Sequence, residues 1–150
     1  MNGPWKNSKK YENALAVSKD AGLLLARLGV GLMFFYVHGL PKIKAGPATW
    51  EKVGGAMAHL GVGFTPVFWG FMAAASECFG GLFLALGLLT RPAAAFMAFS
   101  MFVASVMHLT SGQGMEAASH AIENFFMFAA FILMGAGRFS LDQKIFKGKF

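Results

Sequence analysis

The side chains of this 150-residue sequence that are best suited to proton transfer are its histidines and a few acidic residues in apolar surroundings. His120 and Glu123 are three residues apart, so they project from one side of a helix, and His108 ends the apolar segment before them. Imidazoles titrate near neutral pH and carry protons, which quinone chemistry requires at both carbonyl oxygens. We therefore predict a proton-exchanging site in a polar pocket. Its predicted catalytic residues are Glu77 as the floor, His108, His120 and Glu123.

A metal site is the alternative interpretation of the same histidines, since imidazole and carboxylate ligands also suit zinc or iron. The spacing His-x-x-Glu occurs once, at His120 and Glu123, whereas a di-iron bundle uses paired Glu-x-x-His motifs and four carboxylates. The single cysteine, Cys78, excludes an intrachain disulfide, a CxxC redox pair and a thiolate zinc cage. We assign no metal ligands. A third interpretation, in which the histidines only line a hydrated surface, stays open.

The composition indicates that these residues belong to a membrane protein. Charged side chains make up 13% of the sequence and hydrophobic ones 56%, whereas a soluble domain carries about 25% charged residues. The formal charge of +6 lies in chain ends and loops rather than on one face, which argues against nucleic-acid binding. A membrane-spanning helix needs about 20 mostly apolar residues, and Pro41 is expected to end the first of these. The predicted spans are 21–40, 66–89, 92–109 and 117–137.

These spans predict an all-α fold, a four-helix transmembrane bundle. The membrane domain covers 21–142, between an amphipathic, basic tail at 1–20 and a basic tail at 143–150. In the loop between the first two spans, apolar residues recur at helical spacing over 48–60. This pattern predicts a short amphipathic helix on the outer membrane surface, with Trp50 as its anchor.

The lysines and arginines predict the orientation of the bundle. Nine of them lie in the two tails and in the turn that contains Arg91, whereas three, including Lys42, lie in the loop on the other face. By the positive-inside rule, both termini face the cytoplasm, and we expect the bacterial cytoplasmic membrane. This topology brings all four histidines to the outer face, where His38 and Lys42 adjoin the predicted pocket.

Three charged residues within the spans, Arg27, Glu77 and Glu123, should face the bundle interior, a partner or water, because an ionisable side chain at the bilayer centre costs about 3 kcal/mol. Arg27 and Glu77 differ in predicted depth by about 9 Å, which a long arginine side chain and some helix tilt would nearly bridge. Alternatively, Arg27 reaches the inner headgroups or caps the C-terminal tail. For Glu77 there are two interpretations. Its carboxyl group either makes a structural hydrogen bond between helices, or it gates protons or orients a ligand.

Four motifs in this order resemble the DoxX family of integral membrane proteins, over about 24–142. They are A-R-L-G-V-G at 26–31, H-G-L-P-K at 38–42, A-S-E-C-F-G-G-L-F-L-A-L-G-L-L-T-R-P-A-A at 75–94 and G-A-G-R-F-S-L-D at 135–142. The charged residues at expected family positions are Arg27, Lys42, Glu77, Arg91 and Asp142. The match marks them as family-pattern positions and assigns no catalytic role to them.

The resemblance implies a four-helix inner-membrane protein with both termini in the cytoplasm, in agreement with the charge count. It also implies a link to redox physiology. DoxD-type relatives are associated with thiosulfate:quinone oxidoreduction, and DoxX relatives with membrane complexes that handle oxidative or thiol stress. Related eukaryotic proteins act as chaperones or cargo receptors, so the fold is inherited more safely than the activity.

Three functions follow as hypotheses. The first is a quinone-linked subunit of a membrane oxidoreductase complex. The sequence has no CxxC pair, haem attachment motif or nucleotide-binding loop, so we expect a partner redox protein to carry the electrons, or a homo-oligomer. The lipid bilayer is the other expected partner. The second is a non-enzymatic scaffold or chaperone-like subunit whose glycine-rich faces pack a partner's helices. The third is a small transporter with Arg27 and Glu77 along its path. The cofactor is not named by the sequence, and a quinone is the candidate.

Overall fold

The computed structural model describes residues 4–147, with the side chains of residues 11–147. Throughout this range the regular structure is helical, without a strand. Four helices are long and apolar enough to cross a membrane, which confirms the predicted all-α, four-helix transmembrane bundle. They are Tyr11–Ala45, Pro66–Leu86, Thr90–Thr110 and Gly114–Met134.

The first span is one long helix that contains a π-helical segment. Helix α1 (Pro4–Met33) passes into the π-helix η1 (Phe34–Gly39) and then into α2 (Leu40–Ala45). The prediction that Pro41 ends this span is wrong, because Pro41 lies in the first turn of α2. Proline lacks an N–H group, and its ring crowds the preceding helical turn. The wider turn of the π-helix accommodates that ring, so the helix continues to Ala45.

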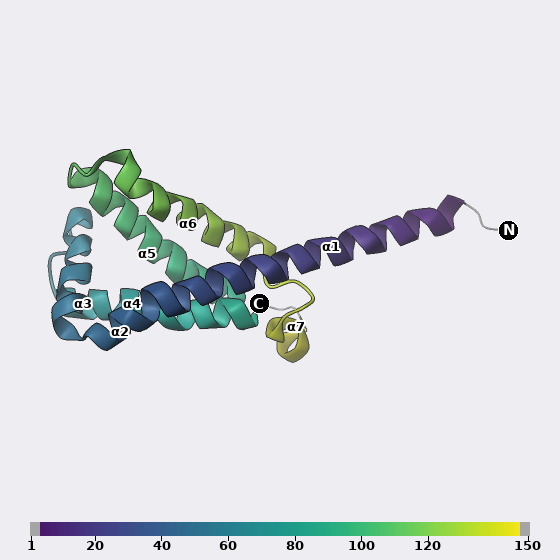
Figure 1. The fold of residues 1–150 in the computed structure, drawn as a ribbon, viewed down its shortest axis with the longest axis horizontal. Helices are drawn as coiled ribbons and strands as arrows, with labels where there is room; N and C mark the ends of the chain where they lie inside the picture. The colour runs from purple at the N-terminus through teal and green to yellow at the C-terminus, as the bar shows by residue number, and fades with distance from the viewer. Residues whose placement is uncertain (1–3, 148–150) are drawn as a thin grey trace.

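The N-terminal part of α1 extends beyond the bundle (Figure 1). In the described part of the predicted tail, residues 4–20 continue the helix of the first span and do not form a separate element. Tyr11 and Leu15 on this extension are 73% and 59% exposed. The extension therefore presents apolar side chains that the rest of the chain does not cover.

The predicted amphipathic helix after the first span is present as two short elements. Gly46, at φ 78°, separates α2 from α3 (Pro47–Gly54), which continues as the 3-10 helix η2 (Gly55–Leu60). Helix α3 crosses the start of α4 (Pro66–Leu86) in close contact, because Gly54 lies against the backbone of α4. A Cβ atom on Gly54 would overlap the carbonyl group of the first α4 residue.

Trp50, the predicted membrane anchor of the amphipathic helix, contacts both α2 and α4. Its indole N–H donates to the carbonyl oxygen of Lys42 at 2.8 Å. Its ring packs edge-on against Phe71 of α4, with ring centroids 5.0 Å apart. Trp50 therefore fixes α3 to both α2 and α4, and with them the position of Lys42.

The spans pack closely where glycines remove side chains. Gly31 of α1 faces α4, and a Cβ atom on it would lie 2.6 Å from the carbonyl oxygen of Gly81 and 2.7 Å from the amide nitrogen of Ala85. Gly80 of α4 lets Met97 approach from the third span. These glycine faces are filled by the chain's own helices. The prediction that these glycines pack against a partner's helices is therefore wrong, because they pack against helices of the same chain.

The last two spans, α5 (Thr90–Thr110) and α6 (Gly114–Met134), form a tight helical hairpin (Figure 1). The turn between α4 and α5 has left-handed conformations at Gly87 and Leu89, so α4 ends slightly earlier than predicted. After α6 the chain folds back, and the short helix α7 (Leu141–Phe146) crosses the predicted boundary between the membrane domain, 21–142, and the C-terminal tail, 143–150. The buried core of the bundle consists of Phe34, Leu84, Ala94, Met97, Ala98, Met101, Phe128 and Phe131.

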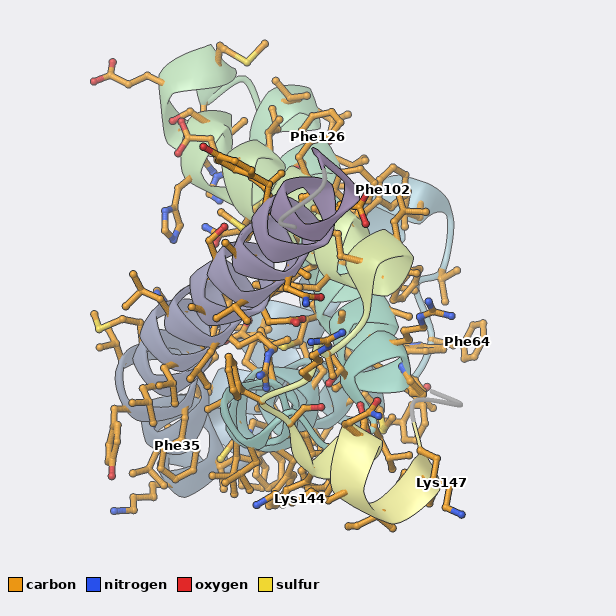
Figure 2. All side chains as sticks on the ribbon, turned by 90° about the vertical axis from the view of Figure 1, so that its right-hand side faces the viewer. Phe35, Phe64, Phe102, Phe126, Lys144 and Lys147 are labelled. Atoms are coloured by element: carbon orange, nitrogen blue, oxygen red, sulfur yellow. The ribbon has the colours of Figure 1, made fainter. Side chains whose placement is uncertain are left out.

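The outside of the bundle is apolar, as expected for helices in lipid. Phe64, Phe102 and Phe126 (labelled in Figure 2) have exposed fractions of 66%, 43% and 65%. Lys144 and Lys147 of α7 lie together at the end from which the N-terminal part of α1 also projects. The polar residues inside the bundle are the exception to this arrangement, and they form the candidate site.

Candidate functional site

A cavity of about 710 Å³ lies between α4, α5 and the α3–η2 segment, and we call it the main cavity. Its apolar wall includes Met57, Phe68, Trp69, Met72, Phe96, Phe99 and Met107. Its polar side chains are Lys42, Lys52, His59, Ser76, Glu77, Ser100 and His108. A mostly apolar cavity of this size with a few polar groups is typical of a small-molecule site.

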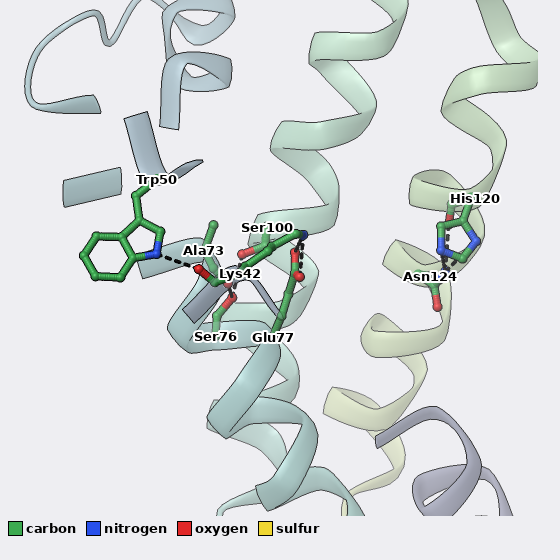
Figure 3. A network of polar contacts seen from close by, with 8 residues as sticks. All are labelled: Lys42, Trp50, Ala73, Ser76, Glu77, Ser100, His120 and Asn124. Atoms are coloured by element: carbon green, nitrogen blue, oxygen red, sulfur yellow. Dashed lines mark hydrogen bonds and ion pairs between the residues drawn. The ribbon is translucent and has the colours of Figure 1, made fainter. Parts of the chain in front are cut away.

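Lys42 and Glu77 form an ion pair in the wall of the main cavity (Figure 3). The Lys42 Nζ atom donates to both carboxylate oxygens of Glu77, at 2.7 Å to Oε1 and 2.5 Å to Oε2. Glu77 is 3% exposed and therefore faces the bundle interior, as predicted. The pair satisfies a carboxyl group that would otherwise be buried without a partner. Glu77 pairs with Lys42 and not, as one interpretation predicted, with Arg27.

Two hydroxyl groups beside the ion pair join the second and third spans. The Oγ atoms of Ser76 on α4 and Ser100 on α5 lie 2.7 Å apart, and Ser76 also donates to the carbonyl oxygen of Ala73. Ser76 directly precedes Glu77, so the hydroxyls and the carboxylate form one polar strip in the apolar cavity (Figure 3). Such a strip can orient a bound molecule by hydrogen bonds.

Two histidines line the main cavity. The Nδ1 atom of His59 on η2 lies 2.6 Å from the Oγ1 atom of Thr110, and Nδ1 of His108 on α5 lies 2.8 Å from Oε1 of Gln113. His59 is exposed and His108 is partly buried. Both imidazoles can therefore exchange protons with water and with a molecule in the cavity.

The other two histidines lie outside the main cavity, against the prediction of a single pocket. The rings of His38 on η1 and His120 on α6 face each other with centroids 5.7 Å apart. The Nδ2 atom of Asn124 donates to the carbonyl oxygen of His120 at 2.8 Å (Figure 3). Helix α6 turns this face toward the first span, whereas the main cavity lies on the other side of α5. The predicted pocket is therefore divided between two places.

Glu123 does not join the predicted catalytic group either, since it is exposed on α6 and does not line the main cavity. All four histidines nevertheless lie at one end of the bundle, as predicted, and we call it the histidine end. In the part of the chain that the structure describes, no three or more His, Cys, Asp or Glu side chains are grouped to hold a metal ion.

Arg27 is fully buried near the opposite end of the bundle. Its Nη2 atom donates to the carbonyl oxygen of Phe139 at 2.7 Å, and Nη1 donates to that of Leu84 at 3.4 Å. Arg27 thus holds the chain segment before α7 against the end of α4, which is the capping role predicted as an alternative. Arg27 does not line the main cavity, so Arg27 and Glu77 do not share this cavity as the transporter hypothesis would require of a common path.

Asp142 holds α7 against the start of α5. Its carboxylate oxygens accept hydrogen bonds from the backbone N–H groups of Leu89 at 2.6 Å and Thr90 at 2.9 Å. A carboxylate at the N-terminus of a helix is stabilised by the helix dipole. Arg91 follows directly and is exposed beside a second, smaller cavity. We call this end, with Arg27, Arg91 and Asp142, the arginine end.

The sequence prediction missed four polar residues of the main cavity, Lys52, His59, Ser76 and Ser100. The position of His59 at the polar side of the predicted amphipathic helix was a usable signal, because that helix was expected at the same face as His108. The two serines carried no such signal, since serine is frequent in transmembrane helices. Their pairing depends on how α4 and α5 rotate against each other.

The comparisons with known proteins identify one family. The DoxX family model matches residues 22–110. No curated protein and no solved structure matches the chain. The matched range contains the ion pair of Lys42 and Glu77 and the cavity histidines, whereas His120, Glu123 and Asp142 lie beyond it.

Proposed function

The chain belongs to the DoxX family of membrane proteins, and we propose that it is a quinone-binding subunit of a membrane oxidoreductase complex. The observation that carries this proposal is the main cavity, which is mostly apolar and has the Lys42–Glu77 ion pair in its wall. We propose that both termini face the cytoplasm in a bacterial cytoplasmic membrane. The histidine end then opens toward the periplasmic side.

The size and lining of the main cavity suit a quinone head group. A volume of about 710 Å³ falls in the range of about 300–1,000 Å³ that small-molecule sites occupy. A quinone ring is flat and apolar, with two carbonyl oxygens as hydrogen-bond acceptors. Phe68, Phe96 and Phe99 provide apolar surface for the ring. The ammonium group of Lys42 donates to one oxygen, and the imidazole of His108 serves the other.

The proposed chemistry is proton transfer at these two oxygens. Reduction of a quinone to a quinol takes two electrons and two protons, one proton for each oxygen. The carboxylate of Glu77, once Lys42 turns to the ligand, accepts and releases one proton, and His108 with His59 exchanges the other. The electrons come from a partner redox protein, because the chain's single cysteine cannot form a dithiol couple.

His38 and His120 provide the proposed route from Glu77 to water. His38 lies at the end of the π-helical segment, four residues before Lys42 in the chain, and its ring faces that of His120. The ring of exposed His120 lies 5.7 Å from that of His38, within reach of a bridging water. Glu123, one turn further along α6, adds negative charge at this exit and favours the arrival of protons.

The test is the binding of short-chain ubiquinone and menaquinone analogues to the purified protein. We expect Lys42→Gln and His108→Ala each to weaken binding by about tenfold or more, because each removes a charged or polar contact. Lys44→Gln, a change of an exposed residue in the same short helix, is the matched control and should bind like the wild type. Equal binding by all four proteins would contradict the proposal.

A scaffold or chaperone-like subunit is the second candidate function. The observation that favours it is the N-terminal extension of α1, where Tyr11 and Leu15 are exposed away from the bundle. Under this alternative, Tyr11→Ser together with Leu15→Ser would lower the amount of protein that co-purifies with a partner. The quinone analogues would bind neither this variant nor the wild type.

A further inference from the structure

A second cavity of about 210 Å³ lies at the arginine end, and we call it the small cavity. It is bounded by the start of α5, the end of α6 and the segment that leads into α7. Its charged side chains are Asp20, Arg91, Arg138 and Asp142. The proposed quinone chemistry does not involve any of them.

Both carboxylates of the small cavity are already engaged. Asp20 pairs with Arg138, whose Nε atom lies 3.5 Å from Oδ2 and whose backbone N–H donates to Oδ1 at 3.0 Å. Asp142 is 1% exposed and accepts the two backbone hydrogen bonds at the start of α5. Within the described residues, neither carboxylate forms an ion pair with Arg91.

Arg91 is the uncommitted charge in this cavity. Among the residues that the structure describes, no hydrogen bond or ion pair engages its side chain. Its guanidinium group lies beside Gly135, where a Cβ atom would be 3.4 Å from Nε and 3.6 Å from Nη2. The glycine, at φ 72°, thus leaves room for the planar group to lie along the chain. A free guanidinium fork binds phosphate oxygens in pairs.

The surroundings indicate that the phosphate belongs to an amphiphile. Met134 lines the small cavity and is 54% exposed. Leu133 and Phe139, which neighbour lining residues in the chain, are 80% and 48% exposed, so apolar side chains are exposed near the charged group. Lys144 and Lys147 of α7 lie at the same end of the bundle (Figure 2). An arginine at the end of a transmembrane helix, with exposed apolar side chains nearby and further cations at the same end of the bundle, fits a lipid headgroup with its acyl chains.

We propose that the small cavity binds the phosphate group of an anionic phospholipid. Arg91 holds the phosphate oxygens, and the acyl chains follow the exposed end of α6 at Leu133 and Met134. With the orientation proposed above, this lipid lies in the cytoplasmic leaflet. The site is separate from the main cavity and does not depend on the quinone proposal.

The test uses delipidated full-length protein in detergent, with native mass spectrometry and thermal unfolding as measurements. Added phosphatidylglycerol should bind and raise the Tm, whereas added phosphatidylcholine and inorganic phosphate should not. Arg91→Gln should reduce phosphatidylglycerol retention by about tenfold, and Arg91→Lys, which keeps the charge without the fork, by less. Lys44→Gln, at the histidine end, should retain the lipid like the wild type.

Three results would overturn this inference. The first is equal retention of phosphatidylglycerol by Arg91→Gln, Arg91→Lys and wild-type protein. The second is retention of phosphatidylcholine as strong as that of phosphatidylglycerol, which would indicate a non-specific annular lipid. The third is stabilisation by inorganic phosphate alone, which would indicate a soluble phosphate ligand. Binding of the quinone analogue to the same samples reports separately on the main cavity and on folding.

Discussion

Lys42 and Glu77 are bound to each other across the junction between the first and second spans, with Nζ within 2.7 Å of both carboxylate oxygens. Lys42 follows the π-helical segment η1, and Glu77 lies in the middle of α4. The side chain of Lys42 is 30% exposed and that of Glu77 is 4% exposed. The ion pair therefore joins two spans through the buried side chain of Glu77, and through the partly exposed Lys42 it also faces the main cavity.

We expect Lys42→Met to lower the free energy of unfolding by about 1–3 kcal/mol, because the carboxyl group of Glu77 loses its partner. The double variant Lys42→Met/Glu77→Gln should regain part of this loss, since no unpaired buried charge is left. Denaturant unfolding in detergent micelles measures both, with Lys44→Met as the exposed control. Strictly additive losses in the double-mutant cycle would show that the two side chains do not interact.

The crossing of α3 over α4 gives a prediction with a control one residue away. Gly54→Ala should destabilise the protein by about 1–3 kcal/mol, because its Cβ atom would overlap the backbone of α4. Gly55→Ala has open space around the new atom and should be neutral or stabilising by up to about 1 kcal/mol. A comparison of the two Tm values checks this. Similar Tm values would mean that α3 and α4 are not in close contact at Gly54.

The spans could be predicted from the sequence because their signal is local. A stretch of about 20 apolar residues has to cross the membrane whatever its neighbours are. The bounds of the last three spans consequently differ from the predicted ones by no more than three residues. The inward orientation of Glu77 followed from the cost of a charge in lipid, which again needs no knowledge of the tertiary structure.

The arrangement of the site could not be predicted, because it depends on helix rotation and on long-range contacts. The spacing of His120 and Glu123 shows that they share a side of α6, but not which neighbour that side meets. Arg27 finds its acceptor at Phe139, 112 residues away, only when the segment before α7 folds back. The π-helix before Pro41 has a hydrogen-bond pattern that hydropathy does not report.

The contacts of Arg27 predict a local effect at the arginine end. Arg27→Met removes the hydrogen bonds to Phe139 and Leu84, so the segment before α7 should detach more often, with a loss of about 2–3 kcal/mol in stability. Hydrogen exchange should accelerate in 139–146 and at the start of α5, and stay unchanged at the histidine end. Lys19→Gln, an exposed change on the same helix, is the control. Uniform acceleration along the chain would indicate global destabilisation instead.

The proposed orientation predicts which residues are accessible from outside a cell. Lys44→Cys, at the histidine end, should react with a membrane-impermeant maleimide on intact cells, whereas Arg138→Cys, at the arginine end, should react only after permeabilisation. Both positions are exposed in the structure, so burial does not explain a difference between them. The native Cys78 is 3% exposed and packs against Gly39, and it should therefore remain unlabelled in the folded wild type. The reverse labelling pattern would place both termini outside, and the main cavity would then open to the cytoplasm.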